Sequence, residues 1–166
     1  LMDQFETVVA ISTYSKLLSA SFRVGYLIAA PQIAREIAEL KLVTVVNSSR
    51  FSEMLTAEMI ASRRYQRHLK RTAQRLVERR DEFRARVEAM GLSVFDRDGG
   101  GYYSFLQLPK RMDETEVARN ALSKGIFLAP GRFFYVNQDV RPPSFRINLT
   151  RSDDPRFYSF LKKELS

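Results

Sequence analysis

One stretch of the sequence combines a lysine with several hydroxyl side chains and an arginine. Residues 12–22 read Ser-Thr-Tyr-Ser-Lys-Leu-Leu-Ser-Ala-Ser-Phe, and Arg23 follows seven positions after Lys16. A lysine amine attacks carbonyl carbons once it has lost its proton, which requires other cationic groups nearby or removal from water. Hydroxyl and backbone donors that gather in a loop can hold a ligand beside such an amine. This loop is therefore the first candidate site, with Lys16 as its reactive group.

A second candidate lies in the run Phe145-Arg146-Ile147-Asn148 near the end of the chain. A guanidinium group binds carboxylates through paired hydrogen bonds, so an arginine on such a strand suits an acidic ligand. A surface arginine on an edge strand is the alternative for Arg146, and Arg141 and Arg151 are rival candidates. Strand alternation would separate the polar and apolar residues onto two faces, with Arg146, Asn148 and Thr150 on one and Phe145, Ile147 and Leu149 on the other.

Three further features could suggest DNA binding, catalysis or ligand contact, but the sequence favours a structural explanation for each. Between Arg63 and Met90 there are ten Lys or Arg against four acidic residues, but no aromatic interleaving or recognition motif accompanies the charge. We expect a solvated helix face on which acidic residues pair with arginines three or four positions away. The lone His68 is expected to have a structural or interdomain role rather than a catalytic one. Tyr102 and Tyr103 are expected to pack within a small lobe rather than to touch a ligand.

The elements that must position these residues begin with a sheet. Phe5–Ile11 and Arg23–Ala30 have the length and composition of buried strands, and they flank the lysine loop. A helix is expected from Pro31, and Asn47-Ser48-Ser49 offers the N-cap of a second one. A third and longest helix is expected from Tyr65 to Met90, because apolar residues recur in steps of three, four or seven, and Gly91 would end it.

The remainder of the chain predicts short strands and two helices. Strands are expected at Leu92–Phe95 and Tyr102–Leu108, with the glycine run Gly99–Gly101 between them. Asp113 should cap a helix through Ser123, with Val117, Ala118, Ala121 and Leu122 facing inward. Further strands are expected at Ile126–Ala129 and Phe145–Leu149. Asp153 or Asp154 should begin a last helix that runs to about Leu165.

Composition limits the classes of protein that the chain can be. Its 166 residues are 45% hydrophobic and 28% charged, as in ordinary globular proteins. With no cysteine and one histidine, disulfide frameworks, thiolate zinc sites and multi-histidine metal centres are excluded. The net charge of +8 favours anionic ligands. Neither a signal peptide nor a membrane-spanning run is visible, so we expect a cytoplasmic protein without a membrane partner.

The segment Thr13-Tyr14-Ser15-Lys16, followed by Arg23-Val24-Gly25-Tyr26, resembles the pyridoxal 5′-phosphate (PLP) lysine segment of fold-type I aminotransferases. The resemblance implies that Lys16 forms the Schiff base with the cofactor, that Thr13 and Ser15 lie on its phosphate side, and that Arg23 pairs with the phosphate. It also implies that Arg146 grips the carboxylate of an amino acid or amino-compound ligand. Pro130-Gly131 matches the family's turn beside the active site, although plain turn chemistry explains it equally well.

Three stretches also resemble the MocR-type members of the GntR regulators, in which a winged-helix DNA-binding domain precedes an aminotransferase-like domain. They are residues 15–25, residues 65–71, and residues 128–134 leading to the strand at 145–148. Leu17 and Ser19-Ala20-Ser21 depart from the commoner Thr and Ala-Pro-Gly of the enzymes. A PLP-binding effector domain is therefore the first functional hypothesis, and a free-standing class I or II aminotransferase is the alternative.

By this resemblance the fold is α/β, a C-terminal fragment of the PLP-dependent transferase fold. The expected parts are the end of the large PLP-binding lobe (1–62), a long connecting helix (63–91) and the small C-terminal α+β lobe (92–166). The family's aspartate for the pyridinium nitrogen, its ring-stacking aromatic and its first phosphate loop all lie upstream of the lysine. We therefore expect this chain alone to bind PLP poorly and to be inactive, and the complete protein to be a homodimer that contacts DNA only through another domain.

Overall fold

A computed structural model describes residues 5–95, 100–137 and 141–165. The chain divides into two compact units, Leu1–Arg71 and Thr72–Ser166, which are considered separately below. The boundary falls within the long helix α3 (Arg64–Glu88). Among the described residues, no helix combines the length and the apolar character required to cross a membrane.

The first unit begins with a two-stranded antiparallel ribbon. Strand β1 (Ala10–Thr13) pairs with β2 (Gly25–Ile28), and Thr13 lies opposite Gly25. The prediction of buried strands is wrong in two respects: β1 starts at Ala10 rather than Phe5, and both strands are largely exposed. Within the described residues the two strands pair only with each other, so the ribbon is not extended at its edges into a larger sheet.

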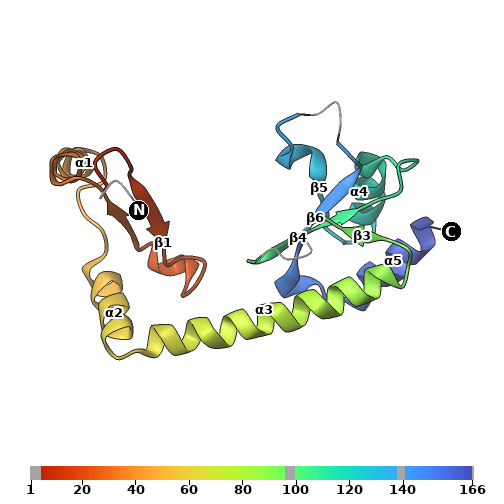
Figure 1. Ribbon diagram of the computed structural model, residues 1–166, viewed down its shortest axis with the longest axis horizontal. Coiled ribbons are helices and arrows are strands. Elements are labelled where there is room, and N and C mark those ends of the chain that lie inside the picture. Colours follow the sequence, from red (N-terminus) through yellow and green to blue (C-terminus); the bar gives the residue numbers. More distant parts are fainter. Residues whose placement is uncertain (1–4, 96–99, 138–140, 166) are drawn as a thin grey trace. The chain divides into compact units, whose positions relative to one another are not determined.

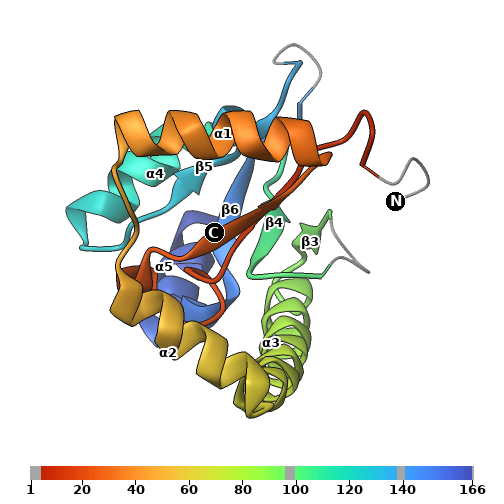
Figure 2. The ribbon, with the colours of Figure 1, turned by 90° about the vertical axis from the view of Figure 1, so that its left-hand side faces the viewer.

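Two helices complete the first unit, and Figure 2 shows them following the ribbon. Helix α1 (Pro31–Thr44) has Pro31 in its first turn, and α2 (Arg50–Ala61) is capped by Ser49, whose hydroxyl accepts a hydrogen bond from the Ser52 amide at 3.4 Å. Both starts were predicted. The apolar face of α1 is nevertheless not buried, since Val43 remains 80% exposed.

Helix α3 ends as its sequence predicts. Gly91 adopts a φ of 77°, and the Leu92 amide donates to the Val87 carbonyl at 3.0 Å, which closes the last turn. On the exposed side Gln74 donates to Glu78 at 3.2 Å, and Arg79 pairs with Glu82 at 3.2 Å. The predicted pairing of an acid with an arginine three or four positions away is thus confirmed for Glu82, whereas Glu78 bonds to a glutamine.

The second unit is a four-stranded antiparallel sheet with its helices packed against one face. The strands lie in the order β3-β4-β6-β5, so β6 is interior and the edge-strand alternative for Arg146 is wrong. Of the predicted strand at 126–129 only Ala129 joins the sheet, together with Pro130, which lies just beyond the predicted end. The elements, in chain order, are β3 (Ser93–Val94), β4 (Tyr103–Gln107), α4 (Glu114–Ser123), β5 (Ala129–Pro130), η2 (Gly131–Phe134), β6 (Ser144–Asn148), η3 (Leu149–Arg151) and α5 (Pro155–Leu165).

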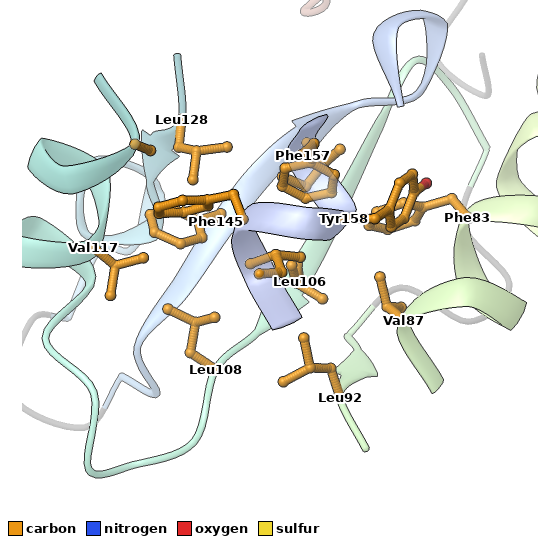
Figure 3. Close-up of a cluster of buried hydrophobic side chains, with 14 of the residues drawn as sticks. Phe83, Val87, Leu92, Leu106, Leu108, Val117, Leu128, Phe145, Phe157 and Tyr158 are labelled. Atoms are coloured by element: carbon orange, nitrogen blue, oxygen red, sulfur yellow. The ribbon is translucent and has the colours of Figure 1, made fainter. Parts of the chain in front are cut away.

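The core of this unit lies between the sheet and helices α3, α4 and α5. Figure 3 shows Phe145 and Leu106 of the sheet pointing toward Phe157 of α5 and Val87 of α3. Phe145 and Leu106 are completely buried, as the alternation along β6 and β4 requires. Of the residues predicted to face inward on α4, Leu122 is an exception, since 59% of it is exposed.

Candidate functional site

Lys16 lies in a tight turn that directly follows β1. The Tyr14 carbonyl accepts hydrogen bonds from the amides of Leu17 at 3.1 Å and Leu18 at 2.8 Å, so the chain folds back around Lys16. The Tyr14 amide donates to the Val24 carbonyl at 3.0 Å, which ties the turn to the start of β2. The lysine is consequently presented by a backbone with internal hydrogen bonds, and its side chain is exposed.

The hydroxyl of Thr13 holds this turn together. It donates to the Val24 carbonyl at 3.1 Å and accepts the Ser15 amide at 3.1 Å. Its one hydroxyl hydrogen is used within the loop, so the phosphate-side role predicted for Thr13 requires the bond to Val24 to open. Ser15 itself is half-buried beside Lys16.

Arg23 has an unusual backbone conformation. It ends the short helix η1 (Ala20–Phe22) with a φ of 53° and a ψ of 34°, in the left-handed region that a non-glycine residue seldom adopts. Ser19 begins that helix, and its hydroxyl accepts the Ser21 amide at 3.2 Å. Such strain persists only where the surroundings fix it, and it is concentrated at functional sites.

Gly25 follows Arg23 closely and makes the tight return possible. A Cβ atom at Gly25 would lie 2.8 Å from the Ser12 carbonyl oxygen, which is closer than such atoms approach. The paired backbones therefore bring Ser12 and Thr13 beside Arg23-Val24-Gly25. An amine, a guanidinium and hydroxyl groups thus come from one short connection, and this set of donors fits an aldehyde cofactor that carries a phosphate.

Aromatic rings support the loop from within the first unit. The Tyr14 ring lies 5.6 Å from the Tyr26 ring and 5.5 Å from the Tyr65 ring, both measured between centroids. The separations are those of favourable aromatic pairs. Sequence reasoning did not assign this cluster, although Tyr14 stands inside the lysine motif.

Arg146 lies on β6 in the second unit, on the sheet face opposite the core. Its guanidinium carbon is 4.2 Å from the centroid of the Tyr103 ring and 4.1 Å from that of Phe134. Its Nε atom is buried and has no hydrogen-bond partner among the described residues. A guanidinium held against rings, with donor capacity unused, is arranged to receive an anionic ligand.

The surroundings of Arg146 are aromatic and include space for a ligand. Phe105 pairs edge-on with Phe134 at 5.8 Å and with Tyr135 at 5.9 Å. Arg146 also lines an open cavity of ≈ 490 Å³, whose lining includes Asp153 and Asp154 but none of these rings. Tyr103 was expected to be a packing residue, and its ring lies directly against Arg146.

The two rival arginines have different surroundings. Arg141 forms an ion pair with Glu114, with 2.7 Å between its Nη1 and the carboxylate oxygen, so its charge is already matched. Arg151 lies in η3 and is exposed. Of these three arginines, Arg146 is therefore the one whose guanidinium packs against aromatic rings, whereas Arg141 is paired with an acid and Arg151 is exposed.

Glu114 is a feature that sequence reasoning missed. Its carboxylate is buried and accepts three hydrogen bonds from three segments: Arg132 N at 2.9 Å, Arg141 Nη1 at 2.7 Å and Ser144 N at 2.7 Å. The sequence signal was the acidic pair at the start of α4, of which Asp113 was correctly assigned as the cap. Nothing in the spacing distinguishes a buried Glu114 from an ordinary first-turn acid.

The candidate residues fall into two groups. Thr13, Ser15, Lys16 and Arg23 come together on one connection of the first unit, and Arg146 belongs to the second unit. Among the described residues, no group of three or more His, Cys, Asp or Glu side chains could hold a metal ion.

Comparison with known proteins relates this arrangement to one family. The family model described as aminotransferase class I and II matches residues 1–158. The HTH-type transcriptional regulator YdcR of Escherichia coli is 30% identical over 82% of this chain, and aromatic-amino-acid aminotransferase 1 of Thermococcus litoralis is 24% identical over 97%. The chain spans 30% and 39% of these two proteins, about a third of their length.

Solved structures of aminotransferases share the fold. Kynurenine aminotransferase of Pyrococcus horikoshii, solved in complex with PMP, superposes with a TM-score of 0.78 and 25% identity, over 96% of this chain and 41% of its own. An archaeal alanine:glyoxylate aminotransferase superposes with a TM-score of 0.84 at 20% identity, over 99% of this chain and 42% of its own. The PLP-dependent transferase fold predicted from the lysine motif is confirmed. The chain belongs to the aminotransferase class I and II family, whose cofactor is pyridoxal 5′-phosphate.

Proposed function

We propose that this chain is part of the PLP-binding, aminotransferase-like effector domain of a GntR/MocR-type transcriptional regulator. The observation that carries the proposal is the connection between β1 and β2, a hydrogen-bonded loop that contains Lys16 and ends at Arg23, whose φ is positive. The regulator assignment is supported by the similarity to HTH-type regulators of Escherichia coli and Bacillus subtilis. In such a protein the cofactor, or an amino compound bound to it, is the signal.

Each proposed residue has a defined task. PLP, when bound, supplies an aldehyde that reacts with amines and a ring that accepts electrons. Lys16 would hold the aldehyde through its amine, and Ser15 and Arg23 would bind the phosphate, joined by Thr13 if its bond to Val24 opens. Arg146 would bind the carboxylate of an amino acid or related compound against the rings of Tyr103 and Phe134.

The decisive experiment is substitution of Lys16 in the complete protein that contains this chain. The Lys16→Gln variant should lose covalent attachment of PLP, measured as the mass of the lysine peptide after borohydride reduction. Lys41→Gln, which removes an exposed lysine of α1 in the same unit, should retain it. If the Lys16→Gln variant still carries covalently attached PLP after reduction, Lys16 is not the residue that binds the cofactor.

The alternative function is a free-standing aminotransferase. It is favoured by the match to the Thermococcus litoralis enzyme, which extends over 97% of this chain. The sequence of the gene upstream of the codon for Leu1 separates the two: a winged-helix segment of about 70 residues ahead of the PLP lobe supports the regulator. A start codon directly before that lobe supports the enzyme.

The proposal includes partners and location. A regulator of this kind would bind DNA through its other domain and would work in the cytoplasm, where it reaches DNA. We also propose a homodimer, because active sites of this fold are shared between subunits. Size-exclusion chromatography with light scattering on the complete protein tests this, and a monomer at micromolar concentration would contradict it.

A further inference from the structure

We propose that Glu114 is a positioning residue for Arg146: it fixes the two segments that hold the arginine and its aromatic support. This inference rests on the proposed role of Arg146 as the carboxylate-binding residue. Among the described residues Glu114 bonds to two backbone amides and to Arg141, and it does not bond to Arg146 itself.

The contacts of Glu114 connect parts of the chain that are far apart in sequence. One carboxylate oxygen accepts from Arg132 N and Arg141 Nη1, and the other accepts from Ser144 N. Only 2% of the residue is exposed. A buried carboxylate with three donors is well satisfied, whereas its loss leaves two backbone amides and a guanidinium without their acceptor.

Both backbone partners lead directly to the Arg146 cluster. Arg132 belongs to η2, the turn that also carries Phe134, and the Phe134 ring lies 4.1 Å from the Arg146 guanidinium carbon. Ser144 is the first residue of β6, two positions before Arg146. Glu114 therefore bonds to the segment that supplies the arginine and to the segment that supplies one of its rings.

The two segments also touch each other, which leaves little room for independent movement. A Cβ atom at Gly131 would lie 1.9 Å from the Ser144 hydroxyl oxygen. The pairing of Pro130 with Phe145 already holds the start of the turn beside the strand, and the shared carboxylate holds the Arg132 amide further along the turn. Without that acceptor we expect the part of the turn beyond Gly131 to shift relative to β6, and Phe134 to shift with it.

The test uses the ¹⁵N-labelled 166-residue chain and reads the Nε–H signal of Arg146, assigned by its loss in Arg146→Lys. Benzoate serves as the probe because it combines a carboxylate with a ring. In the wild type, benzoate should shift this signal. In Glu114→Gln the ligand-free signal should already be displaced, and the dissociation constant for benzoate should rise by about tenfold or more.

Two control variants separate positioning from general destabilisation. Glu116→Gln removes an exposed carboxylate from the same turn of α4 and should leave both the signal and the affinity unchanged. Val117→Ala opens the core under the same helix, so it lowers stability without touching the carboxylate network. If Val117→Ala displaces the Arg146 signal as much as Glu114→Gln does, the positioning role is wrong.

Coupling between the two residues gives a further readout. If Glu114 acts through Arg146, the affinity of Glu114→Gln/Arg146→Lys for benzoate should equal that of Arg146→Lys alone. If Glu114→Gln does not fold, Glu114→Asp replaces it, because its shorter side chain moves the carboxylate away from the three donors. The same Arg146 Nε–H signal is measured in that variant. An unchanged Arg146 signal in a folded variant overturns the inference. If benzoate does not shift the Arg146 signal of the wild type, the carboxylate-binding role of Arg146 is wrong. The position of the ligand-free Arg146 signal in Glu114→Gln still tests the role of Glu114.

Discussion

Among the described glycines of the second unit, Gly131 has the least room for a side chain. Its position in the Pro130-Gly131 turn was attributed to turn chemistry or to the site, and the structure adds a packing reason. The nearest atoms to an added Cβ would be Ser144 Oγ at 1.9 Å and the Ser144 carbonyl oxygen at 3.0 Å. Glycine is needed here for space, because the residue does not adopt a positive φ.

We predict that Gly131→Ala destabilises the second unit by about 1–3 kcal/mol, the range for forcing an extra methyl group into a packed site. Replacing Ser144 by alanine in the same background should restore part of the loss, because it removes the atom nearest to the new methyl group. Urea unfolding monitored by tyrosine fluorescence gives the free energy of unfolding of the wild type, the two single variants and the double variant. Additive losses in the double variant would contradict the contact.

At the residue scale, the sequence indicated the candidate groups of the site but not the residues that surround and support them. Lys16, Arg23 and Arg146 come from the resemblance to the family's motifs, and their roles stay predictions. Glu114 and Phe134 could not be found in this way, because their role depends on contacts between residues that lie 12 to 30 positions apart. Burial of a first-turn acid depends on tertiary packing, which a local pattern does not encode.

At the scale of elements, helix ends were predicted more accurately than strands. Asp113 and Ser49 act as caps, and Gly91 and Gly125 adopt positive φ angles where helices end. These signals are local, since a cap bonds within its own first turn. Strand limits depend on the neighbouring strand: β5 keeps only the two residues that face Phe145 and Arg146, so the apolar pattern at 126–129 overestimated it.

The cap of α4 makes a prediction about acid stability. The Asp113 carboxylate accepts the amides of Thr115 at 2.7 Å and Glu116 at 3.4 Å. The hydrogen bond from Thr115 is the main cause that lowers the pKa of Asp113 below its ordinary value. A carboxyl whose folded pKa is depressed stabilises the folded state above its unfolded pKa, and that contribution disappears as the pH falls through the folded pKa.

We therefore expect the Asp113 carboxylate to stabilise the folded state at neutral pH and to lose this stabilising effect below about pH 4. Asp113→Asn keeps a capping oxygen but cannot titrate in the carboxyl range, so its Tm should fall less steeply than that of the wild type between about pH 5 and about pH 2. Differential scanning calorimetry across this interval provides the comparison, with Glu116→Gln as the control for loss of a carboxylate without loss of the cap. Parallel curves for wild type and Asp113→Asn would show that the cap does not titrate with folding.

At the scale of the whole molecule, the two units differ in how much apolar surface they bury. In the second unit the core contains completely buried side chains from the sheet and three helices, among them Phe145, Leu106 and Leu161. Among the described apolar residues of the first unit only Val24 is buried, whereas Val43 and Phe51 are 80% and 76% exposed. Burial of apolar area is the main favourable term in folding, so the two units should not be equally stable.

This difference predicts two levels of hydrogen exchange in the 166-residue chain. Amides of β4, β6 and α5 should exchange slowly, because they open only with the core, whereas those of α1 and α2 should exchange orders of magnitude faster. Mass spectrometry of peptides after timed exchange gives both rates in one sample. The same measurement on a protein as long as the relatives, of which this chain spans about a third, should raise protection in α1 and α2 and leave β6 unchanged. Equal protection of α1 and β6 in the 166-residue chain would mean that the exposed apolar side chains of the first unit do not limit its stability.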